Sequence, residues 1–186
     1  MTTWLPAADL SPVQLVELLA DPHRRVAAYT RLLALGPEAP DPAQAGLRHS
    51  SPQVREECCK ILDHVMDEAS TPALVAALDD PAANVRYWAL HALACDRCKT
   101  GSCRHPAALV LPRAVAMLEA DPDPHVRAMA AELAGAWVHS QPAAAEALQR
   151  AAGGDPSPAV RKKASWYAPG GPIYRRTRRG PATARH

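Results

Sequence analysis

Apolar residues recur along most of this chain at intervals of three and four, the spacing that places them on one face of an α-helix. Two such faces are formed by Val85, Trp88, Ala89 and Ala92 and by Val126, Met129, Ala130 and Leu133. No segment shows the alternation of apolar and polar residues that a half-buried strand requires. The pattern therefore predicts an all-α protein.

Shorter apolar segments lie between these helices and predict a second set. They comprise residues 11–20, 71–78, 112–120 and 142–152, with residues 41–49 as the weakest member. One helix of such a pair cannot bury its apolar stripe alone, so we expect neighbouring pairs to stack on one another.

A short element begins each longer helix: Asp-Pro, three further residues, Val and usually Arg. It occurs at residues 21–26, 51–55, 80–86, 121–127 and 155–161. The valines of successive copies lie 28, 31, 41 and 34 residues apart. Asp or Ser can cap a helix whose first turn tolerates Pro. Five copies at this period indicate a solenoid of helical hairpins.

These elements resemble the HEAT repeat, in the short bacterial form also found in phycobilisome-lyase-type proteins, and the resemblance covers about residues 10–167. It implies a right-handed α-solenoid of about five HEAT-like hairpins. The first copy departs from the pattern with Ala27 after its valine, and the second has Ser51 in place of Asp. We expect a HEAT-like domain over residues 1–168, interrupted by an insertion at 95–106 and followed by a tail at 169–186.

Four copies carry an arginine directly after the valine. These residues are Arg55, Arg86, Arg127 and Arg161. One interpretation is a basic ladder along one face, and the other is that each arginine pairs with an acid of the same or an adjacent repeat. Candidate partners are Asp80, Asp121 and Asp155. Because this position is usually structural in HEAT repeats, we favour the pairing.

Charge is distributed unevenly over a chain whose net charge is only +2. The tail at 169–186 holds five arginines and no acid, which leaves residues 1–168 with 16 basic and 19 acidic residues. No run of 18 apolar residues is present, and the first residues lack the pattern of a signal peptide. We therefore expect a cytoplasmic protein, whose five cysteines serve as thiols or metal ligands before disulfides.

The insertion contains a Cys-x2-Cys-x4-Cys-x-His pattern formed by Cys95, Cys98, Cys103 and His105. Zn²⁺ is commonly bound by four such ligands in a tetrahedron, and metal binding would order a loop that has few apolar residues of its own. His91 is a rival fourth ligand, one helical turn before Cys95. A full protein ligand set favours structural over catalytic zinc.

Three alternatives for this insertion stay open: an iron–sulfur centre, a redox pair of Cys95 and Cys98, and free thiols in a plain loop. Two further cysteines precede the insertion. The helical spacing places Cys58 in the core and Cys59 at the edge of the same apolar stripe.

The leading functional hypothesis is a non-catalytic adaptor that binds a protein partner on the surface of its second helices. Candidate contact residues are Arg24, Tyr87 and His125. A nucleic-acid-binding protein is the alternative, with the zinc-bound insertion at 95–106 (a zinc knuckle) and an arginine cluster as the interface. That cluster consists of Arg175, Arg176, Arg178 and Arg179. A lyase or thiol oxidoreductase is the third hypothesis, although no catalytic motif is present.

Overall fold

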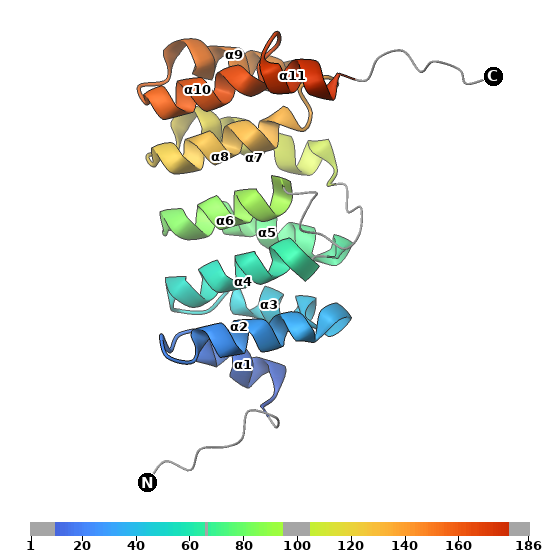
Figure 1. Ribbon diagram of the computed structural model, residues 1–186, viewed down its shortest axis with the longest axis vertical. Helices are drawn as coiled ribbons and strands as arrows, with labels where there is room; N and C mark the ends of the chain where they lie inside the picture. Colours follow the sequence, from blue (N-terminus) through green and yellow to red (C-terminus); the bar gives the residue numbers. More distant parts are fainter. Residues whose placement is uncertain (1–9, 66, 95–104, 179–186) are drawn as a thin grey trace, which may run out of the picture. The chain divides into compact units, whose positions relative to one another are not determined.

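The computed structural model describes residues 10–65, 67–94 and 105–178. The chain divides into two compact units, unit 1 (Met1–His105) and unit 2 (Pro106–His186). Within the described ranges every regular element is a helix and no strand occurs, which confirms the all-α prediction (Figure 1). None of the described helices is long and apolar enough to cross a lipid bilayer.

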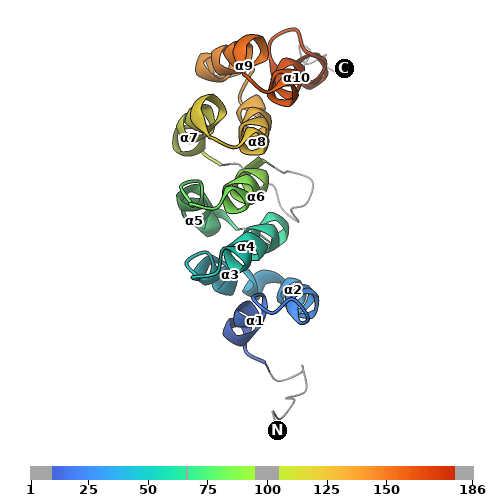
Figure 2. The ribbon, with the colours of Figure 1, turned by 90° about the vertical axis from the view of Figure 1, so that its left-hand side faces the viewer.

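Unit 1 contains three consecutive helical hairpins. Its α-helices are α1 (Pro12–Leu18), α2 (Arg25–Ala34), α3 (Pro40–Gly46), α4 (Pro52–Val65), α5 (Thr71–Ala77) and α6 (Ala83–Ala94), with short 3₁₀ turns η2 (Gly36–Glu38) and η3 (Glu68–Ser70). The first helices α1, α3 and α5 form one layer and the second helices α2, α4 and α6 the other (Figure 2). Contacts of α2 and α6 with α4 make the second layer continuous.

Unit 2 contains two hairpins and a short terminal helix. Its helices are α7 (Ala107–Ala120), α8 (Pro124–Gly135), α9 (Pro142–Gly154), α10 (Pro158–Tyr167) and α11 (Pro172–Thr177). Helix α8 packs against α7 and α10, and α10 packs against α9 and α11. Both units therefore have the stacked-hairpin arrangement that the repeat predicts.

Helices begin where a proline or a capping side chain suits the first turn. Pro12 starts α1, and the preceding Ser11 forms a reciprocal capping box with Gln14. Pro124 starts α8, and the Asp123 carboxylate accepts a hydrogen bond from a backbone N–H of the first turn. A proline is tolerated there because first-turn N–H groups have no partner within the helix.

The repeat valines form the spine of the core in both units. Val54, Val85, Val126 and Val160 are each at most 1% exposed. The faces inferred from the sequence are correct at all four positions in α8, which are buried. In α6, however, Trp88 is half-buried instead of lying in the core, and its ring contacts Lys60 and His91.

Val26, the valine of the first copy, is 77% exposed and differs in this from the other four repeat valines. The chain from Asp21 to Arg24 forms a turn, and α2 begins only at Arg25. In the other copies the arginine after the valine donates to a carbonyl six residues earlier, as Arg55 does to His49. In the first copy Arg25, before the valine, makes this contact, because its Nε donates to the carbonyl of Leu19 at 2.8 Å. Ala28 then takes a buried position in place of Val26.

Two further expectations need correction. Helix α7 starts at Ala107, so Pro112 lies inside it and does not begin it. Burial of Val110 and Leu111 in the preceding turn stabilises a helix that lacks one backbone hydrogen bond. Cys59 is fully buried and not at an edge, with its Sγ 3.9 Å from the carbonyl oxygen of Val85.

The repeated arginines join neighbouring repeats, which supports the pairing interpretation. Arg55 donates to both carboxylate oxygens of Asp80 at 2.6 and 2.8 Å, and Arg127 does the same to Asp155 at 2.8 and 3.0 Å. We call each of these bidentate pairs a clasp. The remaining nitrogen of each guanidinium, Nη1, caps carbonyl groups of the preceding turn. Arg127 Nη1, for example, donates to the carbonyl of Asp121 at 2.8 Å. A basic ladder is therefore excluded at Arg55 and Arg127.

Candidate functional site

The outer surface of the second helices in unit 1 carries a cluster of charged and aromatic side chains. It lies on α4 and α6, which are adjacent in the second layer (Figure 2). We name it the α4–α6 face and define it by Gln53, Glu56, Glu57, Lys60 and Asp63 of α4 and Asn84, Tyr87, Trp88 and His91 of α6.

Three carboxylates of α4 point to one stripe of this face and are largely removed from solvent. The side chains of Glu56, Glu57 and Asp63 are only 14%, 11% and 4% exposed. One ammonium serves two of them, because Lys60 Nζ lies 2.6 Å from Glu56 and 3.2 Å from Glu57. Burial by itself would lower the pKa of Lys60, but its hydrogen bonds to the two glutamates outweigh burial and raise that pKa.

Asp63 is the least satisfied group of the α4–α6 face. Its Oδ2 lies 3.4 Å from Nδ1 of His91. Its Oδ1 is buried and has no hydrogen-bond partner in the part of the chain that the structure describes. A buried carboxylate oxygen without a hydrogen bond is destabilising. The presence of an aspartate at this buried position therefore needs a functional or a structural explanation.

Aromatic rings from α6 form the other half of the face. The rings of Tyr87 and Trp88 meet edge to face with centroids 5.6 Å apart, and Trp88 lies 5.1 Å from the ring of His91. The ammonium of Lys60 sits 5.0 Å from the centroid of Trp88, within the range of a cation–π contact. The face therefore combines carboxylates, one cation and polarisable ring surface.

A hollow of about 330 Å³ opens beside these groups, between the first turns of α4 and α6. Its lining residues are Pro52, Gln53, Glu56, Ala82, Ala83, Asn84 and Val85. Small apolar side chains form much of its wall, while Gln53, Glu56 and Asn84 supply amide and carboxylate groups. Such a hollow suits one or two side chains of a bound molecule.

Sequence reasoning proposed Tyr87 as a contact residue and His91 only as a metal ligand, and it did not assign the other residues to this face. The available signal was the spacing of Glu56, Lys60 and Asp63, which puts them on one side of a helix. The register of α6 against α4 was needed to show that Trp88 and His91 lie opposite them.

Two other candidate contact residues lie elsewhere. Arg24 is exposed at the start of α2, where its Nε is 3.4 Å from the carboxylate of Asp21. His125 is exposed in the first turn of α8, in unit 2, where its backbone N–H donates to Asp123 at 2.7 Å.

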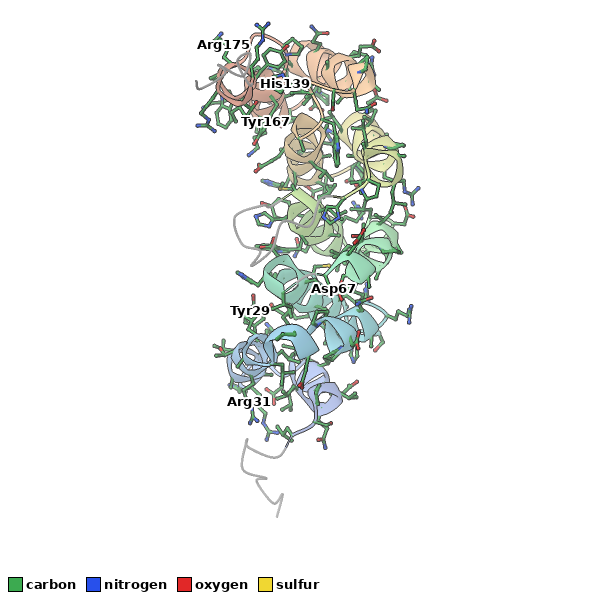
Figure 3. All side chains as sticks on the ribbon, turned by 90° about the vertical axis from the view of Figure 1, so that its right-hand side faces the viewer. Tyr29, Arg31, Asp67, His139, Tyr167 and Arg175 are labelled. Carbon is green, nitrogen blue, oxygen red and sulfur yellow. The ribbon has the colours of Figure 1, made fainter. Side chains whose placement is uncertain are left out.

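The basic candidates belong to the end of unit 2. Arg175 and Arg176 are exposed on α11, Arg178 follows it, and Arg179 lies outside the described residues. Helix α11 docks through Tyr174, whose ring stacks 4.4 Å from that of His139. Figure 3 shows His139 at this end of unit 2, near Tyr167 and Arg175.

Three of the predicted zinc ligands, Cys95, Cys98 and Cys103, lie outside the described residues. The two candidate histidines are described. His105 is buried, and its Nδ1 lies 2.9 Å from the hydroxyl oxygen of Thr71. The Nδ1 of His91 faces Asp63. Among residues 10–65, 67–94 and 105–178, no three His, Cys, Asp or Glu side chains are grouped as metal ligands would be.

The other two cysteines have environments that suppress thiol chemistry. Burial, with a contribution from the charge of Glu57, raises the pKa of Cys58 to about 12. Burial also raises the pKa of Cys59 well above its ordinary value. The thiolate is the nucleophilic form, so neither side chain is suited to redox or covalent catalysis at neutral pH.

Comparison with known proteins agrees with this architecture. A solved structure similar to this chain is the designed armadillo repeat protein YIII(Dq.V1)4CPAF in complex with peptide (KR)4, with 18% sequence identity and a TM-score of 0.57. The similarity covers 85% of this chain and 80% of that one. No curated protein matches the chain. The family model for HEAT repeats matches residues 13–94, 39–109 and 111–168. The chain therefore belongs to the HEAT repeat family.

Proposed function

We propose that this chain is a non-catalytic interaction module whose α4–α6 face binds a segment of a partner protein. The observation that carries the proposal is the hollow of about 330 Å³ between the first turns of α4 and α6, followed along α6 by the half-buried rings of Tyr87 and Trp88. HEAT folds serve several functions, so family membership alone does not choose among them.

The physical properties of this face suit a protein partner. Tyr and Trp are enriched among the residues that dominate binding energy, and such residues cluster where water is excluded. The rings and the hollow lie on two packed helices, which hold them in place before binding and reduce the ordering cost. The nearby glutamates supply the polar contacts that select one segment over another.

Partner capture from the source cell tests this proposal. Asn84→Arg places a long side chain at the hollow from an exposed position, so we expect it to reduce recovery of the partner about tenfold or more. Ala159→Arg is the matched control, because Ala159 has the equivalent, exposed position before the repeat valine in α10. Equal recovery with both variants would contradict the assignment of this face.

We also propose that the insertion at 95–106 is a structural zinc knuckle held by Cys95, Cys98, Cys103 and one histidine. The supporting observation is the contact of 2.9 Å between Nδ1 of His105 and the hydroxyl oxygen of Thr71, whereas Nδ1 of His91 lies farther, at 3.4 Å, from Asp63. An oxygen at one ring nitrogen is the usual means of orienting a histidine that binds zinc through the other. In a cytoplasmic setting the three thiols would stay reduced and able to ligate.

Metal analysis of the purified chain tests the knuckle and its fourth ligand. We expect about one zinc per chain in the native protein. Loss of zinc from His105→Ala, with retention in His91→Ala, would assign His105, and the reverse result would assign His91. Native protein without metal, and with three freely titrating thiols, would contradict the proposal and favour the plain loop or the redox pair.

Nucleic-acid binding is the second candidate, and one observation favours it. Residues 157–178 contain six lysines and arginines and no acid, which produces a strongly positive end on unit 2. Binding of oligonucleotides that weakens steeply with salt, and that is lost on removal of residues 175–186, would support this candidate. A lyase or thiol oxidoreductase is the third, and thiol titration with and without a chelator tests it.

A further inference from the structure

The α4–α6 face has a deficit of positive charge. Among the described residues, its three carboxylates share one ammonium, that of Lys60, and the imidazole of His91. Residues 10–94, the part of unit 1 that lies before the insertion, contain 11 acidic and seven lysine or arginine residues. Carboxylates this far removed from water are stabilised mainly by nearby cations and hydrogen-bond donors.

Asp63 provides an observation independent of the number of acids. It is 3% exposed, and one of its two oxygens accepts no hydrogen bond from any described residue. Each carboxylate oxygen can accept two hydrogen bonds. Because that oxygen is closed off from solvent, a donor from outside the chain reaches it only by displacing the side chains above it, and it would then remove an existing destabilising feature.

Lys60 marks the part of this face where a cation is held, one turn before Asp63 on α4. Its ammonium lies between Glu56 and Glu57 and over the ring of Trp88, at 5.0 Å from the centroid. An ammonium or guanidinium group is the ligand that two carboxylates and an indole ring attract together. In the free chain the ammonium of Lys60 itself fills this position.

We propose that the α4–α6 face is an acceptor site for a cationic side chain of a basic partner segment, and that Lys60 occupies this site as an internal substitute until the partner binds. The proposal deepens the proposed function and rests on it. Arginine suits the site better than lysine, because its planar fork can contact two carboxylates at once and stack on the indole ring.

The dimensions of the face agree with a short extended segment. Gln53 and Asp63 are ten residues apart on α4, which corresponds to about 15 Å along the helix. An extended chain covers that length with about four to five residues. One side chain would enter the hollow beside Gln53 and Asn84, and a cationic one further along would meet Glu56 and Glu57 or, two turns beyond Glu56, Asp63.

Substitution of Lys60 distinguishes this proposal from a merely structural ion cluster, because the expected change is a gain. Lys60→Met removes the internal competitor and keeps the length of the side chain, so affinity for a basic peptide should rise about tenfold. Lys163→Met in unit 2 is the matched control. The Lys163 ammonium also pairs with a glutamate, Glu132, at 2.5 Å and lies 5.9 Å from a Trp166 ring.

The probe is a fluorescein-labelled peptide of about eight residues, with three arginines separated by Gly and Ser. Its binding to the full chain is measured by anisotropy at low and near-physiological ionic strength. Otherwise identical peptides carry Gln or Glu in place of Arg. Circular dichroism checks that each variant is folded, and Glu56→Gln with Asp63→Asn provides the expected loss, of about tenfold or more.

We expect only the arginine peptide to bind, and not the glutamine or glutamate peptide. Its affinity should rise with Lys60→Met, fall with the double variant and stay unchanged with Lys163→Met. Equal binding of the glutamine peptide, or unchanged affinity of Lys60→Met, would overturn the inference. Should the double variant fail to fold, Lys60→Met and the peptide series decide. If the arginine peptide does not bind but Asn84→Arg still abolishes partner capture, the cationic ligand is wrong and the proposed function stands. If neither experiment shows binding, both are wrong.

Discussion

The two units share one stabilising contact and differ in surface charge. Each contains a clasp, Arg55 with Asp80 in unit 1 and Arg127 with Asp155 in unit 2, with N···O distances of 2.6 to 3.0 Å. Residues 10–94 nevertheless hold seven basic and 11 acidic residues, whereas residues 106–178 hold nine and six. The two units thus share the contacts that define the repeat but differ in their exposed charges. For this reason the repeat predicts the fold of the protein and not the identity of its partner.

The largest effect should come from breaking a clasp. Arg127→Leu leaves Asp155 buried without its counter-ion, and we expect a loss of about 3–5 kcal/mol in the free energy of unfolding. Arg55→Leu should cost somewhat less, because the side chains of its clasp are slightly more exposed, at 12% and 8% against 10% and 5%. Denaturant unfolding, with hydrogen exchange of α8 and α10 against α4 and α6, measures both.

The double variant Arg127→Leu with Asp155→Leu is the control for this prediction. Replacing both partners removes the unpaired charge, so most of the lost stability should return. Failure to recover would mean that the carbonyl-capping contacts of Arg127, and not its ion pair, dominate the clasp.

Glycines at close helix contacts should give the next largest effect. An alanine Cβ at Gly46 would collide with Cys58 Sγ and lie 2.9 Å from Val16, and one at Gly135 would collide with the ring of Tyr167. We expect each Gly→Ala variant to lose about 1–3 kcal/mol through overpacking. The loss should be larger at Gly46, because Cys58 is fully buried whereas the half-exposed Tyr167 ring can move.

The sign of these glycine effects is itself the test. In an unobstructed helix, Gly→Ala stabilises by about 1 kcal/mol. An increase in the melting temperature of Gly135→Ala would therefore show that Tyr167 does not pack on α8 as described. Gly153→Ala, whose added Cβ meets no other atom within 4 Å, is the reference variant.

Acid should weaken both clasps. Hydrogen bonds from Arg127 lower the pKa of Asp155. At Asp80 burial by itself would raise the pKa, but the hydrogen bonds from Arg55 and from the Ala82 N–H outweigh burial and lower it. A lowered folded-state pKa means that the contribution to stability is complete above the ordinary carboxyl pKa of 3.8 and is lost as pH falls below it.

Urea unfolding over a pH series measures this dependence. The stability of the parent chain should decrease more steeply below pH 4 than that of Asp155→Asn, which has one fewer such carboxylate. Parallel pH profiles would show that the clasp of unit 2 does not lower the Asp155 pKa.

The smallest effect should come from an exposed ion pair. Arg150 lies 2.6 Å from Glu119 in unit 2, but their side chains are 59% and 44% exposed. Arg150→Ala should change the free energy of unfolding by about 0.5 kcal/mol or less, because solvent and salt screen the pair. A loss comparable to that of Arg127→Leu would remove the distinction between buried clasps and surface pairs.

Much of the fold was predictable because it depends on local patterns. The spacing of Val54, Val85, Val126 and Val160 indicated a stacked repeat, and the clasp partner Asp155 was among the acids proposed for the arginines. The errors arose where a tertiary contact overrides the local pattern. Burial of Val110 and Leu111 lets α7 begin before Pro112, and the packing of α6 on α4 buries Cys59, which the helical spacing had placed at an edge.

The candidate site was less accessible from the sequence. Tyr87 was proposed as a contact residue, which stays a prediction, but Trp88 was assigned to the core, and the stripe of Glu56, Lys60 and Asp63 was not singled out. The insertion cysteines were recognisable from their spacing, and zinc binding there is still a prediction to be tested by metal analysis.

Helix periodicity, capping residues and the repeated Asp-Pro-x-x-x-Val-Arg element are properties of neighbouring residues, so the amino-acid order alone establishes the hairpins and their period. The meeting of Lys60 with Trp88 and of Asp63 with His91 joins residues 28 positions apart on different helices. Such contacts depend on how α4 and α6 are rotated and aligned when Val54 and Val85 are buried. Packing of the core therefore selects which polar groups share a surface, and with them the kind of molecule that the surface can bind.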